Sequence, residues 1–100
     1  MLRYTFEWDP AKAKANLRKH RIGFDRAAEI FLDPLATSIF DEEHSEHEER
    51  WVSLGKDRRG NILALIHTFS EVSVDECKIR IISARRANKR ETRQYEEAKP

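Results

Sequence analysis

The segment RWVSLGKDRRGNILALIHTF, residues 50–69, decides the fold of this chain. Two apolar runs, 50–55 and 61–69, flank the turn residues KDRRG, and this pattern is typical of a β-hairpin. The second run is apolar at consecutive positions, which indicates a strand covered on both faces. We therefore expect this strand to lie in the middle of a sheet.

Further strands are predicted on both sides of the hairpin. The segment ATSIF, 36–40, precedes it, and CKIRIIS, 77–83, follows it after a looser turn, SEVSVDE. No long crossover separates these four strands, so they should form an antiparallel meander. Residues 3–8 alternate polar and aromatic side chains, which predicts one more strand with a single buried face.

Two helices are predicted between the first strand and the meander. Asp9 is placed to cap a helix from about Pro10 to His20, and Asp25 is placed to cap a second helix that Pro34 ends. The spacing of the first helix predicts an inner stripe of Ala13, Asn16, Leu17 and His20.

A closing helix completes the predicted order of elements. Ser83 is placed to cap a helix from about Ala84 to Ala98. The result is an α+β fold, with an antiparallel sheet, two N-terminal helices packed on it and a C-terminal helix. The 100 residues fit a single domain spanning 1–100.

The charges are sorted along the chain, although the formal net charge is only +1. Residues 41–49 hold an acidic block, and residues 78–93 hold a basic one. Between Arg85 and Arg93 there are five cations and one acid, which is the balance expected of a surface that binds a polyanion. A simply solvated helix face is the alternative explanation.

Several candidate residues should meet near one end of the sheet. The pairing of the hairpin brings the carboxylate of Glu49 close to the imidazole of His67. RNA is cleaved without a metal when a base deprotonates the 2′-hydroxyl and cations hold the developing phosphate charge. The alternative for His67 is a strand-end histidine bonded to a neighbouring carbonyl, and the alternative for Trp51 as a base-stacking platform is packing within the fold.

The remaining polar features predict little chemistry. His44 and His47 lie in the acidic block, but their spacing matches no specific metal site, so no metal and no cofactor are expected. Cys77 is the single cysteine, which excludes an internal disulfide and favours a reducing compartment. No signal peptide or membrane span is evident, so we expect a cytoplasmic protein without membrane contacts.

Five segments together resemble the BrnT family of type II toxins. They are FEWDPAKAKANLRKH, RAAEIFLDP, EERWVSLG, LALIHT and IRIISARRANKRETRQYE, and they cover nearly the whole chain. The resemblance implies a RelE-like fold and a ribonuclease activity that arrests translation. It also implies neutralisation by a ribbon-helix-helix antitoxin, BrnA-like, that binds operator DNA, so that DNA is contacted only through the antitoxin.

The family's motif falls on nine positions of this chain: Asp9, Glu49, Arg50, His67, Arg80, Ser83, Arg85, Glu91 and Tyr95. Among them, Asp9 should cap the first helix, and Glu91 and Tyr95 should anchor the last. One position departs from the family, because Arg21 stands where a glycine is expected. A left-handed C-cap there would cost roughly 1 kcal/mol, unless the helix continues to Gly23.

The leading hypothesis is a metal-independent endoribonuclease. Arg80 and Arg85 would hold the phosphate charge, His67 or Glu49 would handle the proton, and Arg50 would position the backbone. Further nucleic-acid contacts are expected from Lys56, Arg58, Arg59, Arg86, Lys89 and Arg90. The alternative is a non-catalytic module whose basic surface holds an antitoxin or nucleic acid. In either case, the acidic block or an antitoxin's carboxylates would cover that surface.

Overall fold

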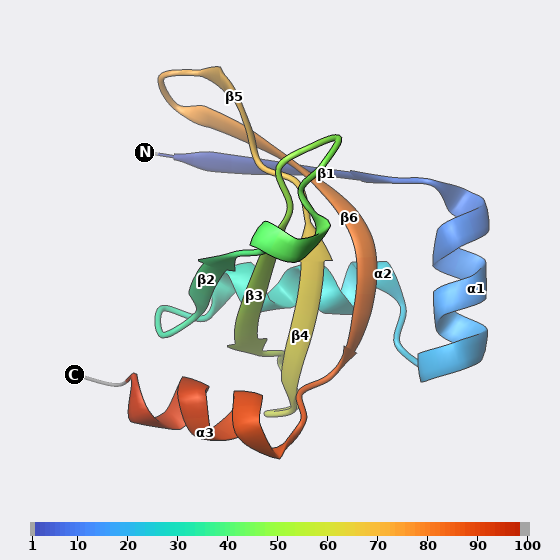
Figure 1. Cartoon of the computed structure of the whole chain (residues 1–100), viewed down its shortest axis with the longest axis vertical. Helices are drawn as coiled ribbons and strands as arrows, with labels where there is room; N and C mark the ends of the chain where they lie inside the picture. Colours follow the sequence, from blue (N-terminus) through green and yellow to red (C-terminus); the bar gives the residue numbers. More distant parts are fainter. Residues whose placement is uncertain (1, 99–100) are drawn as a thin grey trace.

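A computed structural model describes residues 2–98 as a twisted sheet with helices on both faces (Figure 1). The strands are β1 (Arg3–Trp8), β2 (Thr37–Phe40), β3 (Trp51–Lys56), β4 (Ile62–His67), β5 (Ser70–Ser73) and β6 (Glu76–Arg86). Their order is β1-β6-β4-β3-β2, and β5 pairs with β6. The predicted hairpin and the central position of β4 are confirmed.

The sheet is mixed rather than purely antiparallel. β2, β3, β4 and β6 pair antiparallel, as predicted, but β1 pairs parallel with β6. A parallel pair needs a long connection between its strands, and here the whole of the chain between β1 and β6 supplies it. The segment predicted as a loose turn contains β5, which extends the pairing along β6.

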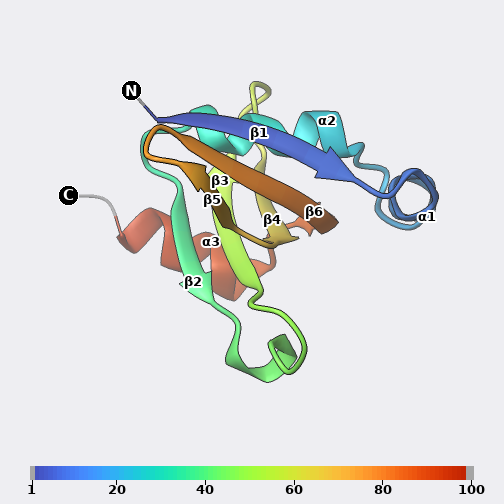
Figure 2. The same ribbon diagram turned by 90° about the horizontal axis from the view of Figure 1, so that it is seen from above.

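The helical elements are α1 (Pro10–His20), α2 (Phe24–Ala27), η1 (Ala28–Leu32), η2 (Glu42–His44) and α3 (Lys89–Glu97). α2 and η1 cover one face of the sheet, and α3 crosses the lower part of the other face (Figures 1 and 2). α1 lies beside the sheet, next to β6. The main core forms under α2 and η1 from Ile22, Phe24, Ala27, Ile30, Leu63, Leu65, Ile79, Ile81 and Ala84.

The first helix begins and ends through specific contacts. An Asp9 carboxylate oxygen accepts a hydrogen bond from the Ala11 N–H at 2.8 Å, as predicted. Asn16 is buried on the inner side, but Leu17 is 50% exposed, so its place in the inner stripe is wrong. The helix ends at Arg21, which adopts the left-handed conformation with φ 62°.

The second helix is capped differently from the prediction. It follows Gly23, and Asp25 lies within its first turn rather than before it. The chain then tightens into η1, whose end at Leu32 agrees with the expected stop before Pro34.

The closing helix begins five residues later than predicted, because β6 continues through Ala84 to Arg86. Ser83 therefore does not cap a helix. The cap is Asn88, whose side-chain oxygen accepts from the Glu91 N–H while the Glu91 carboxylate accepts from the Asn88 N–H. This reciprocal pair satisfies two backbone donors at the start of α3.

Candidate functional site

Arg80 and Arg85 lie on the same face of the sheet, although five positions separate them in β6. In a regular strand, an odd separation places two side chains on opposite faces. The pairing of β4 with β6 shifts by one residue between Ile66 and His67, and this bulge reverses the alternation. Arg85 is opposite Ala64, which packs in the cluster under α3, so both arginines face the side that α3 partly covers.

The two arginines do not share one site. Five strand residues span about 15 Å, and each guanidinium is bonded to a different carboxylate, Arg80 to Glu48 and Arg85 to Glu91. The expectation that they converge on one phosphate is therefore wrong. The upper end of the face, around Arg80, and the lower end, around Arg85, must be considered separately.

At the upper end, Arg50 and Arg80 converge on the carboxylate of Glu48. One Glu48 oxygen accepts a hydrogen bond from Arg80 Nη2, and the other lies 3.6 Å from Arg50 Nη2. Arg50 directly precedes β3, and Arg80 belongs to β6. β4 lies between these two strands in the sheet. Hydrogen bonding from Arg80 and the charges of both arginines lower the pKa of Glu48.

A cavity of about 310 Å³ opens beside this ion-pair group. Glu49 lines it together with Glu48 and Arg80, and Lys78 and Glu7 complete its charged lining. The Lys78 ammonium lies 3.9 Å from the Glu7 carboxylate. The sequence hypothesis included Glu49, Arg50 and Arg80 as site residues. It missed Glu7, Glu48 and Lys78. Lys78 and Glu7 were recognisable only with the parallel pairing of β1 and β6, which places Glu7 opposite Arg80.

At the lower end, Arg85 has a structural contact. Its guanidinium donates two hydrogen bonds to Glu91, at 2.6 and 2.9 Å, and this pair raises the pKa of Arg85 and lowers that of Glu91. The same Glu91 belongs to the cap of α3. Two parallel bonds between a guanidinium and a carboxylate are a rigid arrangement, so Arg85 fixes the start of α3 to β6.

Tyr95 holds the other end of α3 to the sheet. It is 1% exposed, and its hydroxyl donates a 2.5 Å hydrogen bond to Asp33. Burial and this bond raise the pKa of Tyr95 to about 12. The predicted anchoring of the last helix by Glu91 and Tyr95 is confirmed.

His67 lies on the opposite face from the two arginines and is 1% exposed. Its Nδ1 is 2.9 Å from the Thr68 carbonyl, so this nitrogen carries the proton. Nε2 then accepts a 2.7 Å bond from the Ser53 hydroxyl, which in turn accepts from Ser38 at 2.6 Å. Burial lowers the pKa of His67 and favours the neutral ring. Both ring nitrogens are bonded inside the fold, so neither is free to exchange a proton with a substrate, and this geometry favours the structural alternative for His67 over the predicted catalytic role.

The residues predicted to contact nucleic acid gather at the lower end of the sheet, where β3, β4 and β6 begin or end; this end is called the lower edge below. The β3–β4 turn carries Lys56, Arg58 and Arg59, and it lies against the β6–α3 junction, where the Ala87 N–H donates to the Ile62 carbonyl. The side chains of the six predicted residues are all in exposed positions, and none forms an ion pair with any residue between 2 and 98: Lys56, Arg58, Arg59, Arg86, Lys89 and Arg90.

The acidic block shows no arrangement of metal ligands. His44 is bonded to Asp41 at 2.9 Å, and no group of three or more His, Cys, Asp or Glu residues in the described part of the chain is placed to hold a metal ion. Trp51 packs its ring 5.3 Å from that of Phe40, in agreement with the packing alternative. No helix among residues 2–98 is long and apolar enough to span a membrane.

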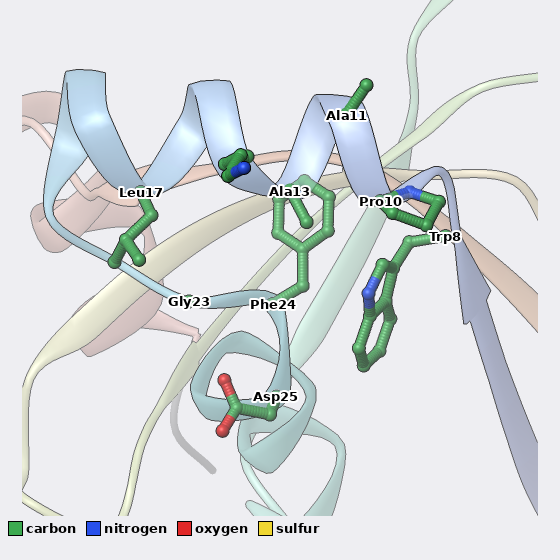
Figure 3. A pocket seen from close by; sticks show the side chains of 9 residues that line it. Trp8, Pro10, Ala11, Ala13, Leu17, Gly23, Phe24 and Asp25 are labelled. Atoms are coloured by element: carbon green, nitrogen blue, oxygen red, sulfur yellow. The ribbon is translucent and has the colours of Figure 1, made fainter.

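A second cavity, of about 580 Å³, lies between α1 and α2 (Figure 3). The side chains of Trp8 and Phe24 form its wall, and Leu17 projects at its rim from α1. It is mainly apolar and lies away from Arg50 and Arg80, so it contributes nothing to an anion site.

Comparison with known proteins now defines the class. Residues 8–91 match the family described as the ribonuclease toxin, BrnT, of type II toxin-antitoxin systems. The fold matches the crystal structure of the Brucella abortus ribonuclease toxin BrnT, with a TM-score of 0.59 and 26% sequence identity over 89% of this chain and 100% of that one. A search of curated protein sequences finds no match. The class is thus that of the ribonuclease toxins. Within it, the chain belongs to the BrnT family, as its sequence motifs suggested.

Proposed function

We propose that this toxin cleaves RNA without a metal ion at the cavity beside Arg50 and Arg80. The observation that carries the proposal is the convergence of these two guanidinium groups on one carboxylate, Glu48. Arginine side chains bind carboxylate and phosphate oxygens through the same planar donor geometry, so a pair that holds a carboxylate suits a phosphodiester. Substrate phosphate would replace Glu48 between the two arginines.

The neighbouring side chains supply the proton transfers. Glu49 lines the cavity and accepts the proton of the 2′-hydroxyl, whose oxygen attacks phosphorus. The new bond closes a 2′,3′-cyclic phosphate, and the bond from phosphorus to the 5′-oxygen breaks. Lys78, from the same cavity, protonates the leaving oxygen, and the two arginines hold the charge that develops on the phosphate. In this scheme Glu49, Lys78, Arg50 and Arg80 touch the substrate.

The exposed cations at the lower edge extend the RNA-binding surface. Arg80 and the β6–α3 junction lie on one strand, so a single-stranded RNA following β6 from the cavity would reach them. Each phosphate neutralised there adds affinity that falls with salt. Arg58→Ala should lower the slope of log affinity against log salt concentration by about one unit. An unchanged slope would remove the turn from the binding surface.

Membership of the family supports a proposal for the cellular setting. A type II toxin has a protein antitoxin, and we propose that the partner is a ribbon-helix-helix protein which binds operator DNA and which holds the toxin inactive in the cytoplasm. Through RNA cleavage the free toxin arrests translation. Co-expression with the neighbouring reading frame, followed by purification through a tag on the toxin, tests the partner. Recovery of the toxin alone, with its toxicity intact, would contradict this assignment.

The decisive assay uses the purified, antitoxin-free protein with RNA in excess EDTA. We expect fragments ending in 2′,3′-cyclic phosphate, and we expect Glu49→Gln to abolish them while RNA binding persists. A wild-type protein that binds RNA in EDTA but does not cleave it would favour the non-catalytic module.

A further inference from the structure

The carboxylate of Glu48 occupies the position that the proposed function gives to the substrate phosphate. Both of its oxygens face guanidinium groups, one toward Arg80 and one toward Arg50. A phosphodiester also presents two charged oxygens, so the two ligands need the same donors. We propose that the segment 41–49, here called the acidic loop, is a tethered competitor that RNA must displace from Arg50 and Arg80. This inference rests on the proposed function.

The loop is built so that Glu48 can leave without unfolding it. Its base is closed by the Asp41 N–H, which donates to the Arg50 carbonyl at 2.8 Å, and by the Arg50 N–H, which donates to the Ser45 hydroxyl at 3.0 Å. Among the side chains of residues 46–49, the polar contacts found within the described chain are the ion pairs of Glu48. Release of Glu48 therefore breaks only the contact to the arginines.

The strength of this contact suits a reversible competitor. The side chains of Glu48, Arg50 and Arg80 are each about one-third exposed, at 37%, 32% and 34%. Water and salt screen ion pairs at that exposure, so they are weak. In addition, Nε of Arg50 is buried and has no hydrogen-bond partner among the described residues, so Glu48 leaves part of this donor set unused. An RNA phosphate therefore has only a weak, water-screened contact to displace.

The neighbouring glutamates are expected to act in opposite ways. Both carboxylates line the cavity. Glu48 limits RNA affinity by occupying the arginines, whereas Glu49 takes part in cleavage in the proposed scheme. Loss of a partly exposed competitor should tighten RNA binding about two- to fivefold. The gain should shrink as salt rises, since salt weakens the contact that Glu48 makes.

Binding of a fluorescent 2′-O-methyl RNA oligonucleotide tests the inference, because the methyl group blocks the attacking oxygen and leaves the phosphates intact. Glu48→Gln is expected to bind two- to fivefold more tightly than the wild type. Glu46→Gln is the matched control, since it removes the same charge from an exposed position of the acidic loop that forms no ion pair with any residue between 2 and 98. It should change the affinity much less.

Four further outcomes have fixed meanings. Equal gains for Glu48→Gln and Glu46→Gln would show a general charge effect and overturn the competitor. Unchanged or weaker binding by Glu48→Gln would overturn it as well. Arg80→Ala separates failure of the competitor from failure of the phosphate site. If Arg80→Ala binds the oligonucleotide as well as the wild type does, the proposed phosphate site is wrong. If Arg80→Ala weakens binding and removes the gain from Glu48→Gln in the double variant, both the site and the competitor are supported.

Discussion

Asn16→Ala is predicted to be strongly destabilising, because Asn16 replaces a missing strand. β1 ends its pairing at Ile81, and beyond that point the free side of β6 needs partners. The Asn16 amide supplies them by donating to the Ala84 carbonyl at 2.9 Å and accepting from the Ala84 N–H at 3.1 Å. It also donates to the Ile22 carbonyl at 3.0 Å, and it is only 7% exposed.

The expected magnitude follows from these three bonds. Truncation leaves one buried N–H and two buried carbonyls short of a partner, at about 1–3 kcal/mol for each group that stays unsatisfied. The better helix propensity of alanine offsets roughly 0.5 kcal/mol of the loss. We expect a net loss of about 3 kcal/mol in the free energy of unfolding, and a fall in melting temperature of about 12–20 °C for a domain of this size.

Urea and thermal unfolding, followed by circular dichroism, measure the effect. Leu17→Ala is the matched control on the same helix, because helical spacing alone assigns Leu17 to the inner face whereas the structure leaves it half exposed. It should cost less than about 1 kcal/mol. The role of Asn16 as a substitute strand is wrong if Asn16→Ala unfolds at the same urea concentration as the wild type. It is also wrong if Leu17→Ala lowers the free energy of unfolding more than Asn16→Ala does.

Three other predictions concern separate features. Arg21→Gly should stabilise the protein by about 1 kcal/mol by relieving the left-handed C-cap, whereas Arg21→Ala, which keeps a Cβ, should give little gain; equal effects in urea unfolding would contradict this. Burial lowers the pKa of His67 in the folded state, so the unfolded chain binds more protons than the folded one as pH falls below about 6.5. The free energy of unfolding should therefore decrease from about pH 6.5 to 5. His67→Gln should flatten this dependence. Arg85→Ala should lower stability by about 1 kcal/mol and leave RNA affinity within twofold, and a large loss of affinity at unchanged stability would return Arg85 to the site.

Local chemistry made the hairpin, the first helix and its Asp9 cap predictable. The start of the last helix was missed because Arg85, Arg86 and Ala87 are all good helix formers. Only pairing with β4 keeps residues 84–86 in the strand. A usable signal was present, since Asn88 followed three positions later by Glu91 is a capping box. Ser83 was the alternative cap, but it has no Glu or Gln three positions later to complete a capping box.

The candidate site was less accessible to sequence reasoning. Arg50, Arg80 and Glu49 were identified, but Glu48 was not, because an irregular loop has no periodicity to show which of two adjacent carboxylates faces inward. The common face of Arg80 and Arg85 depends on the bulge opposite Ile66, and strand alternation predicts the contrary. His67 was chosen for its chemistry, whereas its burial depends on packing against Phe31, whose ring lies 5.3 Å away.

The rate of RNA cleavage in EDTA by Arg80→Ala is the most direct test of the phosphate site. It is best measured under single-turnover conditions with saturating protein, so that binding and chemistry are separated, and with Arg58→Ala as a control from the lower edge. Loss of a group that holds developing charge should slow cleavage by about 100-fold or more, while Arg58→Ala keeps the wild-type rate. Cleavage by a folded Arg80→Ala protein at the wild-type rate would contradict the account.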